Sequence, residues 1–228
     1  MTELISCIVP AYNSGKYITE TLDSIFAQTY PAIEVIVADD GSTDGTQDIV
    51  RTYPQKVKLL TQDNSGPAET RNLGLLAAAG SFIAFLDADD LWVPEKLSKQ
   101  MSRFENDPAL DLCISYTQMF WPKHLEDEAE KYQNYMRSGP IPGYATTTLL
   151  AKRYVFDKIG VFDRHYWFGD ATDWFLRVKE AGLKFEMVPE VLTLHRMHET
   201  NLTRRRSKAS RDEFLAIVKA SLDRRRGR

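Results

Sequence analysis

The 228-residue sequence fits one large domain or two small ones, and a compact chain of this length buries roughly 70% of its unfolded surface. Hydrophobic residues at 43% and charged residues at 27% exclude a disordered chain, a collagen-like repeat and a disulfide scaffold. The net charge of −3 is unevenly distributed, because residues 201–228 hold ten Lys or Arg against three acids, which leaves −10 for residues 1–200. An acidic body argues against nucleic acid as a partner.

The apolar stretches and the cysteines indicate the compartment. No stretch approaches the ~20 residues needed to cross a bilayer, and no basic region followed by an apolar segment opens the chain. Cys7 and Cys113 fall in apolar runs typical of buried strands, where a thiol behaves as a small hydrophobe. We therefore expect a cytoplasmic protein.

Apolar runs and helical periodicities alternate along the first ninety residues. Strands are predicted at residues 4–9, 33–38, 57–61 and 82–86, and helices at 18–26, 43–53 and 68–79. Near-continuous apolar strands joined by helices are typical of a parallel sheet covered on both faces. The prediction is an α/β fold with a doubly wound, mostly parallel sheet flanked by helices.

The second half of the chain is less regular. The pattern predicts a helix at 94–106, a strand at 110–120, a polar segment at 121–143, a short helix and turn around 154–161, a helix at 174–181, a strand at 183–191 and a terminal helix at 212–222. No internal repeat is present.

Polar residues follow several of the predicted strands. Ligands of open α/β sheets bind beyond the carboxyl ends of the strands, where Asn13, Asp40 and the run Asp87-Ala88-Asp89-Asp90 are expected. Paired carboxylates there repel each other unless a cation is present, and oxygen ligands suit Mg²⁺ or Mn²⁺. In the alternative interpretation, the acids cap the following turn and helix, and Asp90 is the member expected to be only a cap.

Four motifs occur in a fixed order, and together they carry more weight than any one of them. They are Ile8-Val9-Pro10-Ala11-Tyr12-Asn13, Ala38-Asp39-Asp40-Gly41-Ser42-Thr43-Asp44-Gly45-Thr46, Asn64-Ser65-Gly66-Pro67-Ala68 with Arg71-Asn72, and Phe85-Leu86-Asp87-Ala88-Asp89-Asp90. Their order and spacing resemble those of glycosyltransferase family 2, which has the GT-A fold. The resemblance covers residues 4–95 strongly and 143–203 more loosely.

The resemblance implies a nucleotide site in the first half. The base would lie against Pro10 and Tyr12, with Asp40 and Arg71 holding its edge, and Asp87 would contact the ribose. Taken alone, Arg71 would be read as a solvated helix charge.

The same resemblance implies a metal site. Asp89 would contact a Mn²⁺ or Mg²⁺ ion that bridges the diphosphate of the donor, and His198 in the C-terminal segment would approach the metal or the diphosphate. His195 is expected to be structural.

The general base is the least clear part of the resemblance. Family members often place an Asp six residues before an Arg at the start of a helix, but six residues before Arg177 stands Ala171. Asp170 and Asp173 are both candidates, because residues three apart share a helix face. We favour Asp170, since the start of the helix is nearer the cleft, whereas Asp173 can be a first-turn dipole charge. In the alternative interpretation, Asp170 is an N-cap.

These expectations describe a metal-dependent, inverting glycosyltransferase that moves a sugar from a nucleotide-diphosphate donor, with UDP-sugars favoured, to an acceptor hydroxyl. Two alternatives stay open. A haloacid-dehalogenase-like phosphohydrolase also places Asp-x-Asp after a buried strand, although three strand-helix units come first here and Leu91 stands where that family has Thr or Val. A non-catalytic glycosyltransferase-like binding domain is kept open by Ala171.

The predicted division is a catalytic domain at residues 1–203, with a nucleotide-sugar half at 1–100 and an acceptor half at 101–203, and a basic C-terminal helix or tail at 204–228. Arginines at 204–206 and 224–226 bracket an apolar stripe of Phe214, Leu215, Ile217, Val218 and Leu222. Such a helix either docks on the domain or lies on an anionic membrane, which would make the protein membrane-peripheral.

Overall fold

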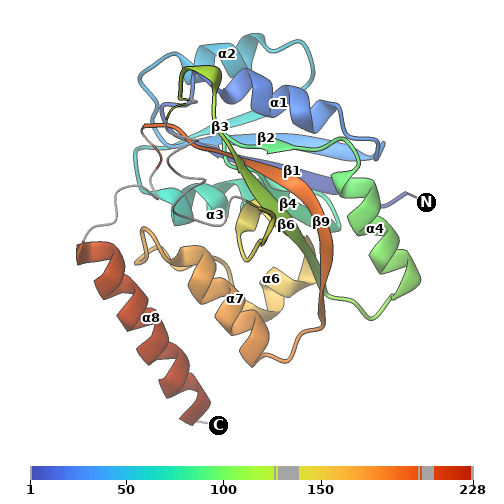
Figure 1. The fold of residues 1–228 in the computed structure, drawn as a ribbon, viewed down its shortest axis with the longest axis vertical. Helices are drawn as coiled ribbons and strands as arrows, with labels where there is room; N and C mark the ends of the chain where they lie inside the picture. The colour runs from blue at the N-terminus through green and yellow to red at the C-terminus, as the bar shows by residue number, and fades with distance from the viewer. Residues whose placement is uncertain (1, 126, 128–138, 200, 202–207, 227–228) are drawn as a thin grey trace.

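A mixed β-sheet runs through the centre of the molecule, and helices cover both of its faces (Figure 1). The structure is a computed structural model that describes residues 2–125, 127, 139–199, 201 and 208–226. The strands are β1 (Ile5–Ala11), β2 (Ile33–Asp39), β3 (Lys58–Thr61), β4 (Phe82–Phe85), β5 (Leu91–Trp92), β6 (Leu112–Phe120), β7 (Ile141–Pro142), β8 (Leu150–Lys152) and β9 (Phe185–Arg196). The helices are α1 (Ile18–Phe26), α2 (Thr46–Thr52), α3 (Pro67–Ala77), α4 (Lys96–Asn106), α6 (Tyr154–Ile159), α7 (Asp170–Glu180) and α8 (Lys208–Arg226).

The strand order is β3-β2-β1-β4-β8-β6-β9-β5, with β7 paired to β6. Strands β3, β2, β1 and β4 are mutually parallel, as are β6 and β9, whereas β8 and β5 pair antiparallel with their neighbours. The predicted α/β fold with a mostly parallel sheet is therefore confirmed. The short strands β5, β7 and β8 were not predicted, because two or three residues carry no measurable periodicity.

The side chains of β1 explain why this strand reads as continuously apolar. Ile5, Cys7 and Val9 belong to the core under α1 and α4, whereas Ile8 belongs to the core under α3. Helix α3 packs so closely on β1 that a Cβ at Gly74 would lie 2.3 Å from Cγ2 of Ile8. Both cysteines are free and buried, and burial raises the pKa of the Cys7 thiol to about 12.

Helix α7 begins at Asp170, one turn before the predicted start of residue 174. The prediction followed the apolar residues, but acidic side chains in the first turn favour an earlier start, because they interact well with the positive end of the helix dipole.

Helix α8 packs along α7 at the periphery of the molecule (Figure 1). Ile217 is fully buried there, and a Cβ at Gly169 would lie 2.3 Å from its Cδ1. Of the two alternatives for the tail, the structure shows α8 in contact with α7, whereas Arg204, Arg205 and Arg206 lie outside the described residues. In the part of the chain that the structure describes, no helix combines the length and the apolar character needed to cross a bilayer.

Candidate active site

The predicted site residues gather at the carboxyl edge of the parallel strands. β1, β2 and β4 run in the same direction and end at Ala11, Asp39 and Phe85, so the loops that follow them meet at one edge of the sheet. Asn13 joins two of these loops, since its N–H donates to Ser42 Oγ at 2.8 Å and its side-chain oxygen accepts from Thr43 N at 2.8 Å. The first two motifs therefore form one connected structure.

Asp40 organises the loop that leads into α3. Its Oδ1 accepts hydrogen bonds from Ser65 N at 2.8 Å and from Gln62 Nε2 at 2.7 Å, and its Oδ2 accepts from Gly66 N at 2.9 Å. The carboxylate is 4% exposed. Asp40 thus fixes the Asn64-Ser65-Gly66 turn, and the Oδ2 atom keeps a lone pair for a further donor.

Pro10 and Tyr12, which were expected to contact the nucleotide base, lie at the carboxyl end of β1. Pro10 is half-buried near the end of β1, and Tyr12 follows the strand with 51% of its surface exposed. An exposed aromatic side chain at this edge offers a flat surface on which a base can stack.

Arg71 joins the two halves of the site. One terminal nitrogen donates to Asp87 Oδ1 at 3.0 Å and the other to Asp170 Oδ2 at 2.6 Å, across 99 residues of sequence. Burial alone would lower the pKa of the guanidinium, but the ion pairs with Asp170 and Asp87 outweigh this effect and raise it above its ordinary value. Arg71 Nε is buried without a hydrogen-bond partner among the described residues. Arg71 is therefore no solvated helix charge but a buried cation held by two carboxylates.

Asp89 and His198 approach each other from opposite ends of the sequence. Their Oδ2 and Nε2 atoms are 2.8 Å apart, and the His198 ring lies 4.7 Å from the ring of Tyr17. One carboxylate and one imidazole fit a Mn²⁺ ion that receives its remaining ligands from elsewhere. Among the described residues, no group of three or more His, Cys, Asp or Glu side chains is arranged to hold a metal.

Asp90 does not cap a helix, contrary to the prediction. It is 1% exposed, contacts His195 Nδ1 at 2.9 Å and accepts from Arg196 N at 3.0 Å, so it fastens β9 beside the Asp87–Asp90 turn. Burial raises the pKa of Asp90 to about 6, although His195 opposes this effect. Burial would lower the pKa of His195, but its contact with Asp90 outweighs burial and raises it to about 9. The expected structural role of His195 is therefore an ion pair at neutral pH.

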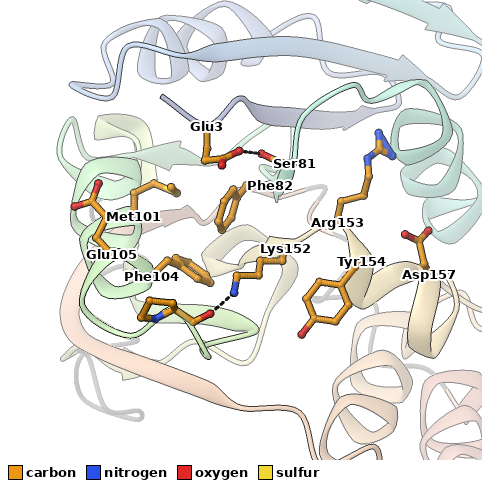
Figure 2. A pocket seen from close by; sticks show the side chains of 11 residues that line it. Glu3, Ser81, Phe82, Met101, Phe104, Glu105, Lys152, Arg153, Tyr154 and Asp157 are labelled. Carbon is orange, nitrogen blue, oxygen red and sulfur yellow. Dashed lines mark hydrogen bonds between the residues drawn. The ribbon is translucent and has the colours of Figure 1, made fainter. Parts of the chain in front are cut away.

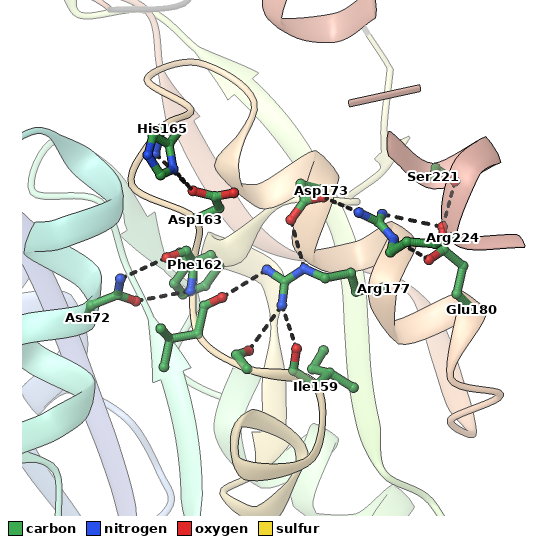
Figure 3. Close-up of polar contacts among 12 residues, drawn as sticks. Asn72, Ile159, Phe162, Asp163, His165, Asp173, Arg177, Glu180, Ser221 and Arg224 are labelled. Atoms are coloured by element: carbon green, nitrogen blue, oxygen red, sulfur yellow. Dashed lines mark hydrogen bonds and ion pairs between the residues drawn. The ribbon is translucent and has the colours of Figure 1, made fainter. Parts of the chain in front are cut away.

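The two candidate bases have different surroundings, and Figure 3 shows those of Asp173. Asp173 Oδ2 accepts from Arg177 Nε at 2.7 Å, and its Oδ1 lies 3.3 Å from a terminal nitrogen of Arg224. These contacts occupy both oxygens and connect α7 to α8. Asp170, the first residue of α7, contacts Arg71 and faces the motif residues instead. The geometry therefore favours Asp170 over Asp173.

Two residues near the site, Trp167 and Glu213, were not predicted from the sequence. The Trp167 ring covers the turn after β3, since a Cβ at Gly66 would lie 2.7 Å from it. Glu213 of α8 accepts from the backbone N–H groups of residues 167, 168 and 169 at 2.8–3.2 Å, directly before Asp170. No local sequence pattern indicates either contact, because Trp167 and Glu213 are remote in sequence from Gly66 and from Asp170 respectively.

A cavity of about 560 Å³ lies away from these residues (Figure 2). Glu3 and Ser81, which line it and bond to each other, directly precede β1 and β4, at the edge of the sheet opposite the motifs. Lys152 donates to Pro108 O at 2.6 Å. None of the predicted site residues lines this cavity.

The fold and this carboxyl edge define a class, the nucleotide-sugar transferases of GT-A architecture. The comparison with family models is specific: residues 6–160 match Glycosyl transferase family 2, and the chain belongs to that family. The haloacid-dehalogenase alternative is thereby wrong, because the Asp-x-Asp run follows the fourth strand of a different fold.

Relatives and solved structures agree with this assignment. An uncharacterised glycosyltransferase of Nostoc sp. is 30% identical over 213 residues, which cover 86% of this chain and 66% of the relative. The glucosyltransferase WfaP of Escherichia coli, whose name gives UDP-Glc as donor and a diphosphoundecaprenol-linked GlcNAc as acceptor, is 31% identical over 86% of this chain and 78% of its own.

Two solved structures share the fold. The S. aureus TarS 1–349 complex with UDP-GlcNAc has a TM-score of 0.75 at 23% identity, covering 96% of this chain and 65% of that one. The mannosyltransferase PcManGT of Pyrobaculum calidifontis, in complex with GDP-Man and Mn²⁺, has a TM-score of 0.66 at 23% identity, covering 88% and 59%. The chain thus spans about two thirds of the length of several proteins it matches.

Proposed function

We propose that the chain transfers a sugar from a nucleotide-diphosphate donor, a UDP-sugar by preference, to an acceptor hydroxyl with inversion at the anomeric carbon. The observation that carries the proposal is the Arg71 bridge between Asp87, in the nucleotide half, and Asp170, in the acceptor half. Through this bridge, the buried cation of Arg71 contacts both Asp87, a carboxylate expected to bind the sugar donor, and Asp170, the candidate general base. The division into halves at residues 1–100 and 101–203 and a tail from residue 204 stays part of this proposal.

The nucleotide base of the sugar donor would lie between Tyr12 and the turn that Asp40 fixes. Asp40 Oδ2 can accept one more hydrogen bond, as an imide N–H of uracil would supply, and the unpartnered Nε of Arg71 can donate to an oxygen. The Arg71 Nε atom is buried, where an unmade hydrogen bond costs about 1–3 kcal/mol. A bound base would remove that cost. The UDP and UDP-GlcNAc complexes of TarS support the choice of nucleotide.

Asp89 and His198 are the residues that would hold a divalent ion, and Mn²⁺ suits their mixed oxygen and nitrogen ligands. Such an ion, when bound, neutralises the charge that develops on the departing diphosphate. The PcManGT complex with Mn²⁺ supports the same choice.

Asp170 would act as the general base. Its carboxylate takes the proton of the acceptor hydroxyl while the hydroxyl oxygen bonds to the anomeric carbon, and the bond from that carbon to the diphosphate oxygen breaks on the opposite face. Arg71 holds the carboxylate in place through the 2.6 Å contact. A positioned base typically contributes 10² to 10⁴ in rate.

The decisive experiment measures nucleotide release with a panel of UDP-sugars. Asp170→Asn should lower transfer by roughly 10²-fold or more while donor affinity stays near wild type. The matched change Asp173→Asn should instead lower thermal stability, because it weakens the contacts with Arg177 and Arg224. Donor binding without any release by the wild type would leave the non-catalytic binding domain as the function. Dependence on Asp173 alone would place the base there.

The location is also a proposal. The free thiols Cys7 and Cys113 support the reducing cytosol. An anionic membrane surface is the proposed site of peripheral contact, through the tail.

A further inference from the structure

Helix α8 has two distinct faces. Ile217 and Ser221 are buried against α7, and Arg224 contacts Glu180 and Asp173. The apolar residues of the other face are exposed: Phe214, Leu215, Val218 and Leu222 have 55, 65, 36 and 46% of their surface accessible. The packing on α7 therefore buries only one of the two apolar faces of α8. The second face is exposed on a helix that lies at the periphery of the molecule (Figure 1).

The charges of α8 are arranged around this outer apolar face. At ~100° per residue, Arg211 and Arg225 lie within about 20° of Val218, one two turns before it and the other two turns after it. Exposed Lys208, Lys219 and Arg226 add further positive charge. The acids Asp212 and Asp223 lie about 120–140° away from Val218, outside the stripe. The outer face thus combines apolar side chains with basic residues at both of its ends.

We propose that the outer face of α8, formed by Phe214, Leu215, Val218 and Leu222 with Arg211 and the basic C-terminal end, binds an anionic lipid surface. The helix would lie parallel to the membrane, with its apolar side chains in the headgroup region and its cations on lipid phosphates. Charge selects this occupant, because a second copy of the same basic face would repel it. The proposal identifies the residues that make the contact and is independent of the transfer reaction.

The test is flotation of the full chain with vesicles of phosphatidylcholine alone and of phosphatidylcholine with phosphatidylglycerol. We expect binding to the anionic vesicles only. Arg211→Glu with Arg226→Glu should lower the partition coefficient roughly 30-fold or more, because each basic residue near an anionic surface contributes to binding. Phe214→Ser with Leu222→Ser should lower it at least tenfold. Arg225 is left unchanged because it also lies 3.9 Å from Glu180.

A control variant carries the same charge change elsewhere. Lys56→Glu with Lys158→Glu reverses two exposed cations on other elements and should bind vesicles as well as the wild type, apart from a small loss common to any lower net charge. Thermal unfolding of each variant verifies that α8 stays docked. Equal binding to neutral and anionic vesicles, no binding, or equal losses in the α8 and control variants would overturn the proposal. Self-association without lipid that Phe214→Ser with Leu222→Ser abolishes would assign the face to a second copy instead.

Discussion

Replacing Lys96 with methionine should flatten the rise in the protein's stability between about pH 7 and 9. Lys96 begins α4 and is fully buried, with its Nζ 2.7 Å from Gln100 Oε1 and 4.2 Å from the centre of the Trp92 ring. None of the described carboxylates forms an ion pair with it. Burial lowers the pKa of its ammonium group from 10.5 to about 7.

The magnitude follows from the two protonation states. Between the two pKa values, the unfolded chain keeps a proton on Lys96 that the folded chain has lost, so the free energy of unfolding increases with pH. The full shift corresponds to roughly 5 kcal/mol, of which about 2 kcal/mol falls between pH 7 and 9. Lys96→Met also leaves Gln100 Oε1 without its donor, at a cost of about 1–3 kcal/mol, but this cost does not vary with pH in that range.

Urea unfolding at about pH 7, 8 and 9 measures the slope. His195 contributes with the opposite sign, because its pKa is raised to about 9 and the stability it provides is lost as the pH rises from about 6.5 to 9. This contribution is common to both proteins and cancels in their difference. Lys99→Met is the matched control, since Lys99 lies on the same helix but is only half-buried and pairs with Glu190. The same slope in Lys96→Met as in the wild type would refute the reasoning.

Two further predictions concern the site. Glu213→Ala should lower the transfer rate at least tenfold with little change in donor affinity, because three backbone N–H groups before Asp170 lose their acceptor. Ser221→Ala, on the same helix, is the control and should change only the stability of the protein. If Glu213→Ala and Ser221→Ala lower the transfer rate equally, α8 stabilises the fold and Glu213 has no separate role at the site. Asp89→Asn should remove the part of nucleotide binding that depends on Mn²⁺, measured as the thermal shift with and without the ion. Wild-type transfer that persists in excess chelator would contradict the proposed metal site.

The sequence predicted the parts of the fold that depend on local pattern. The four strand-helix units of the first half appear with their ends within a few residues, because apolar periodicity and turn residues are local properties. The placement of Asn13, Asp40 and Asp87 at one edge followed from the parallel order of β1, β2 and β4, which those units imply. The roles of these residues in binding a donor were implied by the family resemblance alone and stay a prediction.

The acceptor side could not be assembled in the same way, because its contacts join segments that are remote in sequence. β8 inserts antiparallel between β4 and β6 through three residues that carry no strand pattern. The apolar residues of α8 share one sequence pattern, yet Ile217 is buried and Leu215 is 65% exposed. Only packing against α7 separates the two faces of that helix.

Arg71 shows how such remote contacts change the interpretation of a single residue. Taken alone, Arg71 would be interpreted as a solvated helix charge, but the turn fixed by Asp40 directs α3 toward the edge where Asp87 and Asp170 lie. A cation buried at this point requires carboxylates on both sides, since one left unpaired there would be strongly destabilising. Arg71 therefore connects Asp87 to Asp170, and a nucleotide-sugar that accepts a hydrogen bond from its Nε–H would contact the same guanidinium that binds Asp170.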